Sequence, residues 1–400
     1  MRNRAQQASL LILGISLGFW TTAIDSPKQA FSATVSTLSQ QLSQTNRAFL
    51  QEPLDPTVLF QKGDRLDADG NAISDVAFDR TGKYIATASD SLTLWHRDGT
   101  PTVVVETIDD LPIKQVRFSP DGTIIAATRE TPDRSFEIAS EYRTVELWQF
   151  DGEQLQPFQS LPHGEWVEKV EFSPSGKTIA TVGRDRTIKV WNLNGWQLKT
   201  LPGEDFSFSP DGRTIATTGT DGTVTLWQVG GWILRPILEI PHDVPITRVS
   251  FSPEGDRIAT TSDDGTIFLW SPQGEAIAQI QGHDDRVNRL EFSNDGRWLT
   301  TAGRDGQVRL WHLDGLTVST FEGYDAVFSP DSRFIAIDDG NSTIGVWNLE
   351  TWKNQSIVKP RYSYGSLYFG PDSQTLALTE NFDVQLWDIA IDNGQLTIDN

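Results

Sequence analysis

Three histidines of this 400-residue chain each precede a threonine, an aspartate and a tryptophan at the same spacing. The Thr follows the His by 18 residues, the Asp by 22 and the Trp by 28 in the sets His163, Thr181, Asp185, Trp191; His242, Thr260, Asp264, Trp270; and His283, Thr301, Asp305, Trp311. A hydroxyl, an imidazole and a carboxylate are the parts of a hydrolytic triad. An enzyme needs one such site, so three copies favour a repeated structural role.

These sets are part of a longer internal repeat. The phrase Phe-Ser-Pro-Asp-Gly or a variant of it occurs eight times, and a Trp follows each copy after an alternating segment. The Phe residues are Phe78, Phe118, Phe172, Phe208, Phe251, Phe292, Phe328 and Phe369, and the Trp residues are Trp95, Trp148, Trp191, Trp227, Trp270, Trp311, Trp347 and Trp387. One supersecondary unit is therefore copied eight times, which is the sign of a repeat architecture.

Within a unit the apolar residues alternate with period two. The fifth unit reads ITRVSF, RIATTS, TIFLW and EAIAQI, with turn residues between these segments. Such segments are typical of short strands separated by tight turns. The pattern predicts an all-β fold, a β-propeller of four-stranded antiparallel blades with eight blades, or with seven blades and one irregular unit as the alternative.

With these motifs the chain resembles the WD-repeat β-propeller family over residues 73 to about 399, in a bacterial type with an N-terminal export signal or anchor. The resemblance implies that each His, Thr, Asp and Trp set forms a buried hydrogen-bond chain, which we call a clasp. Each of these half-buried polar groups needs a partner, and the four can satisfy one another. His96 and His312 follow the anchor Trp where the family's Asp usually stands, and only Trp387-Asp388 keeps that pair.

Several units depart from the clasp pattern. The fourth and seventh units are short and have lost the His loop, and the first has a shortened turn at Ser89-Asp90. Asn341 and Asn381 replace the turn Asp in the last two units. We expect these blades to lack a complete clasp and to be less rigid.

The N-terminal segment has the pattern of an export signal, because Arg2 and Arg4 precede an uncharged stretch from Ala5 to Ile24. A cleaved signal peptide, an uncleaved anchor and an apolar tail of a protein that stays inside the cell remain alternatives. The predicted organisation is a signal or anchor over 1–33, a polar linker over 34–56 and the propeller over 57–400. It implies an exported, periplasmic or extracytoplasmic location, with membrane contact only through the N-terminal segment.

Composition excludes several chemistries. The chain has no Cys, so disulfides, thiolate zinc sites and cysteine nucleophiles are excluded. Its 54 acidic and 33 basic residues give a net charge of −21, which argues against binding to a phosphate backbone. No cofactor motif is present. Asp64, Asp67, Asp69 and Asp75 surround Gly70, but the spacing does not fit an EF-hand calcium loop, so we expect a polar loop and no metal.

Two segments compete to complete the last blade and close the ring. Gln395 to Ile398 follows the eighth unit, and Thr57 to Lys62 precedes the first. The family's rings are commonly closed by an N-terminal strand, which favours Thr57 to Lys62. Closure removes two unpaired strand edges.

Two features suggest a partner site on the face where the resemblance places the clasp loops. The first is Trp166 with Arg184, Arg286 and Arg304, since a loop Trp beside arginines is typical of interface anchors. The second is an insertion in the second unit, Arg129 to Arg143, which carries Arg134, Phe136 and Tyr142. The alternatives are packing against a neighbouring blade and a solvated hairpin extension.

The resemblance implies a non-catalytic scaffold that binds a protein or peptide on this loop face. The alternative is an exported propeller enzyme or carbohydrate-binding protein with a site in the central funnel. That alternative requires a single cluster of His, Glu or Asp on the innermost strands, and Glu168, Thr247 and Asn288 show none. Fold alone does not decide between them.

Overall fold

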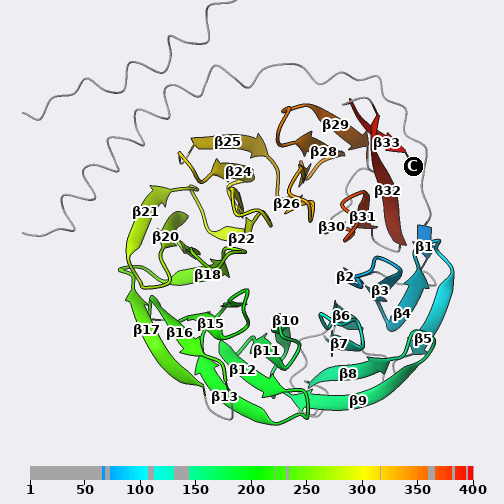
Figure 1. Cartoon of the computed structure of the whole chain (residues 1–400), viewed down its shortest axis with the longest axis horizontal. Helices are drawn as coiled ribbons and strands as arrows, with labels where there is room; N and C mark the ends of the chain where they lie inside the picture. Colours follow the sequence, from blue (N-terminus) through cyan, green and yellow to red (C-terminus); the bar gives the residue numbers. More distant parts are fainter. Residues whose placement is uncertain are drawn as a thin grey trace, which may run out of the picture. The chain divides into compact units, whose positions relative to one another are not determined.

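The computed structural model describes residues 65–67, 73–106, 112–129, 144–219, 221–230, 234–315, 317–358, 365–380, 383–392 and 395–399. All of them belong to one unit, Ala48–Asn400. Within these ranges every regular element is a strand, and eight antiparallel sheets follow one another around a ring (Figure 1). The predicted all-β propeller with eight blades is confirmed. Among these residues no helix is long and apolar enough to cross a membrane.

The first four blades each contain four strands in chain order, so that neighbours in sequence are neighbours in the sheet. Blade 1 is β2 (Asp75–Phe78), β3 (Tyr84–Ala88), β4 (Ser91–His96) and β5 (Pro101–Glu106); blade 2 is β6 (Ile113–Phe118), β7 (Ile124–Arg129), β8 (Thr144–Phe150) and β9 (Leu155–Pro162); blade 3 is β10 (Val167–Phe172), β11 (Thr178–Gly183), β12 (Thr187–Asn192) and β13 (Gln197–Pro202); blade 4 is β14 (Phe206–Phe208), β15 (Thr214–Thr218), β16 (Thr223–Gln228) and β17 (Arg235–Pro241).

The next three blades keep this order, and the last blade has an additional strand. Blade 5 is β18 (Ile246–Phe251), β19 (Ile258–Ser262), β20 (Thr266–Trp270) and β21 (Ala276–Gln281); blade 6 is β22 (Val287–Phe292), β23 (Trp298–Gly303), β24 (Gln307–His312) and β25 (Thr317–Glu322); blade 7 is β26 (Asp325–Phe328), β27 (Phe334–Asp338), β28 (Thr343–Asn348) and β29 (Asn354–Val358); blade 8 is β30 (Leu367–Phe369), β31 (Thr375–Glu380), β32 (Asp383–Asp392), β33 (Gln395–Asp399) and β1 (Arg65–Asp67).

The core lies between blades. Val145 and Leu147 of blade 2, for example, are buried with Val170, Ile179 and the anchor Trp191 of blade 3. Because each blade buries its apolar side chains against a neighbour, no blade completes a core alone. This explains why the same strand pattern recurs in all eight units.

The repeat phrase forms the turn between the first and second strands of a blade. In blade 4 the Ser209 hydroxyl donates to Asp211 Oδ1 at 2.6 Å and accepts the Thr214 N–H at 2.9 Å. Gly212 has φ of +65°, a left-handed conformation that Gly adopts without steric cost. The Ser, Asp and Gly of the phrase are therefore turn formers.

Two segments, one from before the first blade and one from after β32, pair with β32 in the last blade. Arg65–Asp67 pairs with Asp383–Gln385 at one end of β32, and Gln395–Asp399 pairs with Asp388–Asp392 at the other end. Both fit because β32 is ten residues long. The N-terminal segment proposed for this role, Thr57 to Lys62, lies outside the described residues.

The antiparallel order fixes two faces of the ring. Connections from a fourth strand to the next first strand, and from a second strand to a third, reach one face, which we call the loop face. The remaining turns reach the opposite face, which we call the turn face. Figure 1 shows first strands such as β18 nearest the axis and fourth strands such as β21 at the circumference.

Candidate interaction face

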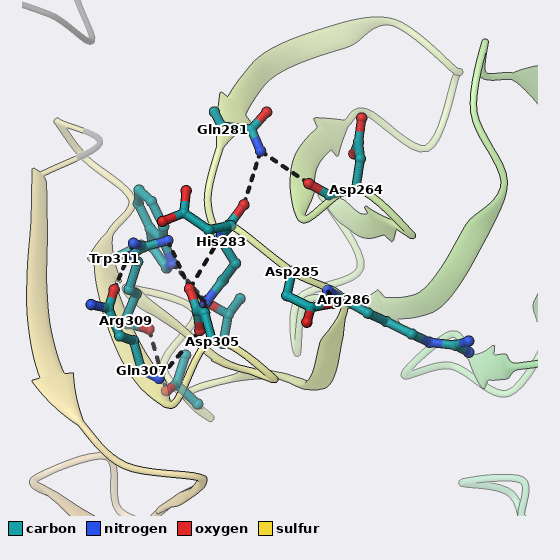
Figure 2. A network of polar contacts seen from close by, with 12 residues as sticks. Asp264, Gln281, His283, Asp285, Arg286, Asp305, Gln307, Arg309 and Trp311 are labelled. Atoms are coloured by element: carbon teal, nitrogen blue, oxygen red, sulfur yellow. Dashed lines mark hydrogen bonds and ion pairs between the residues drawn. The ribbon is translucent and has the colours of Figure 1, made fainter.

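The clasp of blade 6 is a continuous hydrogen-bond chain (Figure 2). The Trp311 indole N–H donates to Thr301 Oγ1 at 3.1 Å, and the Thr301 hydroxyl lies 2.7 Å from His283 Nε2. His283 Nδ1 lies 3.0 Å from Asp305 Oδ1. This hydrogen-bond chain connects the β21–β22 loop to β23, to β24 and to the turn between these two strands, and so holds the loop in place.

The clasp of blade 3 has an extra member. Trp191 donates to Thr181 at 3.1 Å, and Thr181 lies 2.9 Å from His163 Nδ1. His163 Nε2 is 3.7 Å from Asp185, beyond hydrogen-bond distance. Thr187 bridges them, since its hydroxyl lies 3.4 Å from His163 Nε2 and donates to Asp185 at 2.8 Å.

In blade 5 the Asp is not part of the chain. Trp270 donates to Thr260 at 3.2 Å and Thr260 contacts His242 Nε2 at 3.1 Å, but His242 Nδ1 contacts the Ile240 carbonyl. Asp264 instead accepts the Ser262 hydroxyl at 2.5 Å. The Asp is therefore occupied by a neighbour of its own turn.

One small residue explains this difference. Blades 3 and 6 have Gly183 and Gly303 where blade 5 has Ser262. A Cβ on either glycine would overlap the imidazole of its blade, His163 or His283. The glycine leaves space for the His beside the Asp. The exchange of Gly for Ser is therefore the signal in the sequence that distinguishes blade 5, and the His, Thr, Asp and Trp spacing alone does not reveal it.

Burial keeps the clasp histidines neutral. It lowers the pKa of His163 to about 4, with the Lys189 charge adding to the effect and Asp185 opposing it. Burial also lowers the pKa of His242 and His283. A neutral imidazole has one donor and one acceptor nitrogen, as a one-directional chain from Trp through Thr to Asp requires.

The remaining blades have a partial clasp or none. In blades 1 and 4 the anchor indoles of Trp95 and Trp227 donate to Thr87 and Thr217, each at 2.9 Å. The Thr of a clasp stands on the second strand, two residues after the residue that pairs with the anchor Trp. In blades 2, 7 and 8 this position is occupied by Ala127, Ile337 and Leu378. These three blades have no side-chain hydroxyl there.

An ion-pair chain connects four blades on the loop face. Arg286 of the β21–β22 loop lies 3.2 Å from Glu204 and 3.6 Å from Asp263. Glu204 also lies 3.2 Å from Arg186. Figure 2 shows the Arg286 side chain leading away from His283. Side chains of blades 3, 4, 5 and 6 are thus joined over one surface.

The other predicted contact residues lie on the same face or outside the described ranges. Arg184 Nε lies 3.4 Å from Glu168 Oε1, and its N–H donates to the Trp166 carbonyl at 2.9 Å. The Arg304 N–H donates to the Arg286 carbonyl at 2.9 Å. Arg134, Phe136 and Tyr142 of the insertion fall outside the described residues.

Carboxylates stand at two register positions of the innermost strands, three residues and one residue before the repeat Phe. The sequence-based prediction missed them because Glu168, Thr247 and Asn288 stand four residues before that Phe. The carboxylates are Asp75, Glu171, Asp205, Glu291 and Asp325. Each forms an ion pair with a cation of the inner strands, namely Arg117, Lys169 or Arg289. Burial raises the pKa of Glu171 and of Glu291, although Lys169 and Arg289 oppose the shift.

The acidic segment near residue 70 does not assemble as a calcium loop in the described part. Asp75 is buried, forms an ion pair with Arg117 and accepts the Tyr368 hydroxyl at 2.5 Å. Asp64 and Asp69 lie outside the described residues. Among the described residues no group of three or more His, Asp or Glu side chains is arranged to hold a metal.

Comparison with known proteins identifies the repeat. The family model described as WD domain, G-beta repeat matches residues 62–96, 155–192, 196–228, 235–271 and 274–312. The crystal structure of the C-terminal WD40 domain of Sif2 superimposes with a TM-score of 0.68 at 16% identity, covering 83% of this chain and all of that one. The chain therefore contains WD40 repeats in a WD40-type propeller, a fold that serves as a protein-interaction scaffold.

Two similar proteins come from fungi. Nuclear distribution protein PAC1-1 of Uncinocarpus reesii is 38% identical over 63 residues, which are 15% of this chain and 14% of that protein. Nuclear distribution protein nudF of Aspergillus niger is 26% identical over 152 residues, 34% of this chain and 33% of that protein. The chain thus matches at most a third of the length of these two relatives.

These relatives contradict the predicted exported or periplasmic location, because they are nuclear distribution proteins of fungi. They also give no support to a bacterial type, a signal or a membrane anchor. The prediction was based on Arg2, Arg4 and an uncharged stretch, a pattern that export signals share with other apolar segments. Residues 1–33 lie outside the described residues.

Proposed function

We propose that this propeller is a non-catalytic scaffold that binds a protein or peptide on the loop face of blades 3 to 6. Trp166, Arg184, Arg286 and Arg304 are the residues in contact with the partner. Arg134, Phe136 and Tyr142 of the 129–143 insertion, which lie outside the described residues, are further candidates for that contact. The WD40 repeats and the structural likeness to a WD40 domain support a scaffold role.

The observation that carries the proposal is the ion-pair chain of Arg186, Glu204, Arg286 and Asp263. The clasp of blade 6 holds the loop of Arg286, and the clasp of blade 3 holds the turn of Arg186. Arg286 is only 28% exposed, whereas Arg186 is 66% exposed and reachable by a partner. Long side chains that are already fixed lose less conformational entropy on binding. A partner therefore meets a preorganised polar surface across four blades.

The charge of this surface indicates the chemistry of the partner. In blades 3 to 7 the loop-face connections hold four arginines and twelve carboxylates outside the strands. They are Arg184, Arg186, Arg286 and Arg304, and Glu165, Asp185, Glu204, Asp205, Asp221, Asp243, Asp263, Asp264, Asp284, Asp285, Asp305 and Asp339. Complementary charge speeds and orients association. The expected partner presents a basic segment.

The test compares two matched triple variants of the full chain. The loop-face variant combines Trp166→Ala, Arg184→Ala and Arg304→Ala, and the control combines Trp196→Ala, Arg213→Ala and Arg257→Ala on the turn face. Trp196 is 67% exposed, so its removal leaves the core intact. Proteins that copurify from an extract of the source organism are quantified by mass spectrometry, and thermal unfolding checks that both variants fold.

We expect the loop-face variant to recover at least about tenfold less of a specific partner than the wild type and the control recover. Truncation of interface anchors costs more than about 1.4 kcal/mol of binding free energy. Equal recovery by the folded loop-face variant would contradict the proposed face. Loss with the control alone would move the site to the turn face.

A further inference from the structure

The first strands of blades 3, 5 and 6 have a cation at the same register position. Three residues before the repeat Phe stand Lys169, Arg248 and Arg289, and we call this the axial position. One residue before the same Phe, on the same side of the strand, blades 3 and 6 carry Glu171 and Glu291. Blade 5 carries a serine instead.

In blades 3 and 6 two carboxylates hold the axial cation. Lys169 Nζ lies 2.8 Å from Asp205 of the next blade and 3.6 Å from Glu171 of its own strand. Arg289 lies 2.7 Å from Asp325 of the next blade and 3.0 Å from Glu291 of its own strand. The arrangement is the same in both blades: one Asp from the following strand and one Glu from the same strand.

Blade 5 has neither carboxylate. The following strand presents Arg289 at the axial position, and Ser250 takes the place of the glutamate. Arg248 donates from Nε to the Asn288 carbonyl at 2.9 Å and from Nη1 to the Thr247 carbonyl at 3.1 Å. Among the described residues no carboxylate forms an ion pair with it.

The two carbonyls hold the guanidinium without neutralising it. A guanidinium has five N–H donors, so three remain beyond the two that the backbone accepts. Arg248 is partly exposed, and the paired cations Lys169 and Arg289 retain 35% and 34% exposed side chains, so solvent reaches this level of the axis. A fixed guanidinium with free donors matches a carboxylate in a bidentate geometry.

We propose that Arg248 binds an acidic side chain, Asp or Glu, of the partner that docks on the loop face, in place of the two carboxylates that blade 5 lacks. The inference rests on the proposed function. β18 begins at Ile246 on the loop face, so Arg248 lies toward that end of the axis and a partner side chain reaches it from there. The acidic loops around it bind the basic residues that flank the acidic one.

The test is a double-mutant cycle with defined peptides. The probes are Lys-Lys-Glu-Lys-Lys and Lys-Lys-Gln-Lys-Lys with both ends blocked, together with the Gln peptide with a free C-terminal carboxylate. Their affinities for the wild type, Arg248→Gln and the control Arg213→Gln are measured by fluorescence anisotropy. Arg213 lies in the β14–β15 turn on the turn face.

We expect the wild type and the control to bind the Glu peptide about tenfold more tightly than the blocked Gln peptide, because a charge-assisted hydrogen bond is lost. In Arg248→Gln the two affinities should become equal. The assignment to a side chain would be overturned if the wild type bound the Gln peptide with a free C-terminus about tenfold more tightly than the blocked Gln peptide, while the Glu peptide showed no such gain in affinity.

If the wild type binds the Glu and blocked Gln peptides equally while the loop-face triple variant weakens both, the role of Arg248 is wrong and the loop face stands. If the wild type binds none of the peptides, the role of Arg248 is also wrong. In that case the copurification experiment still decides the loop face, because it does not depend on these probes.

Discussion

Blades 3 to 6 and blades 7 and 8 have the same strand arrangement but different side-chain hydrogen bonds. In blades 3 to 6 every anchor Trp donates to a Thr, and three of the four loops hold a clasp His. In blades 7 and 8 the Thr position is Ile337 or Leu378, which cannot accept a hydrogen bond. The family model matches the first group and neither member of the second.

Blades 7 and 8 have an additional connection to the preceding blade on the turn face. Ser332 and Ser373 replace the Gly of the repeat phrase and keep its left-handed backbone, with φ of +59° and +60°. Their hydroxyls accept the N–H groups of Asp295 and Asp331 in the preceding blades, at 3.0 and 2.9 Å. One strand pattern therefore tolerates such connections on either face, and among the described residues the chain from Trp through Thr to His occurs in blades 3, 5 and 6.

The largest effect is expected for Thr301→Val in blade 6. The change leaves the Trp311 N–H and His283 Nε2 buried without a partner, which costs roughly 3 kcal/mol of unfolding free energy. Urea unfolding measures it against Thr300→Val, whose hydroxyl makes only a 3.5 Å contact with a carbonyl. Equal losses in the two variants would show that the clasp contributes nothing of its own.

Gly303→Ala tests the space beside the clasp. A Cβ at this position would overlap both His283 and Asp305, so we expect a loss of about 2 kcal/mol through overpacking. Gly230 has nothing within 4 Å of such a Cβ, and Gly230→Ala is the control. Denaturant midpoints give the comparison, and a tolerated Gly303→Ala would contradict the role of the glycine.

The pH dependence of stability reports on His163. Its pKa is about 4 in the folded chain against an ordinary value of 6.5, so the stabilisation is present above pH 6.5 and is lost as the pH falls toward 4. Between pH 7 and pH 5.5 the loss should be about 1 kcal/mol. His163→Gln should remove this part of the profile, and an unchanged profile in that variant would assign the effect to other groups.

The smallest effect is expected for Ser262→Gly in blade 5. Without the Ser262 hydroxyl, Asp264 becomes available to His242, which should turn from the Ile240 carbonyl. Stability should change by less than about 1 kcal/mol, because the gain opposes the backbone entropy of a new Gly. The measurement is the His242 pKa by NMR, which should rise beside a carboxylate. A lower or equal pKa in the variant would show that His242 does not change its partner from the Ile240 carbonyl to Asp264.

Local signals were sufficient to predict the blades but not their connections. Phe251 and Trp270 mark the strands of blade 5, because the apolar alternation and the turn residues are both visible within one unit. The ion pair of Lys169 and Asp205 joins different blades, so the sequence around either residue does not predict it. Likewise, β1 and β33 share β32 because that strand is ten residues long, a length that no motif of the chain marks.

The candidate site was predicted in part for the same reason. The spacing of His283, Thr301 and Trp311 identified groups that lie together. The spacing could not show that the Ser262 hydroxyl donates to Asp264, since this hydrogen bond exists only because Ser stands where the other clasp blades have Gly. The ion pair of Arg286 with Glu204 connects residues two blades apart and has no local sequence signal.

Hydrogen–deuterium exchange of the unmodified chain tests the central difference most directly. We predict that amides of β23 and β24 in blade 6 exchange more slowly than those of β27 and β28 in blade 7, because the clasp opposes local opening. The two pairs have the same place in their blades, so each is the reference for the other. Equal or slower exchange in blade 7 would contradict the claim that the clasp makes blade 6 more rigid than blade 7.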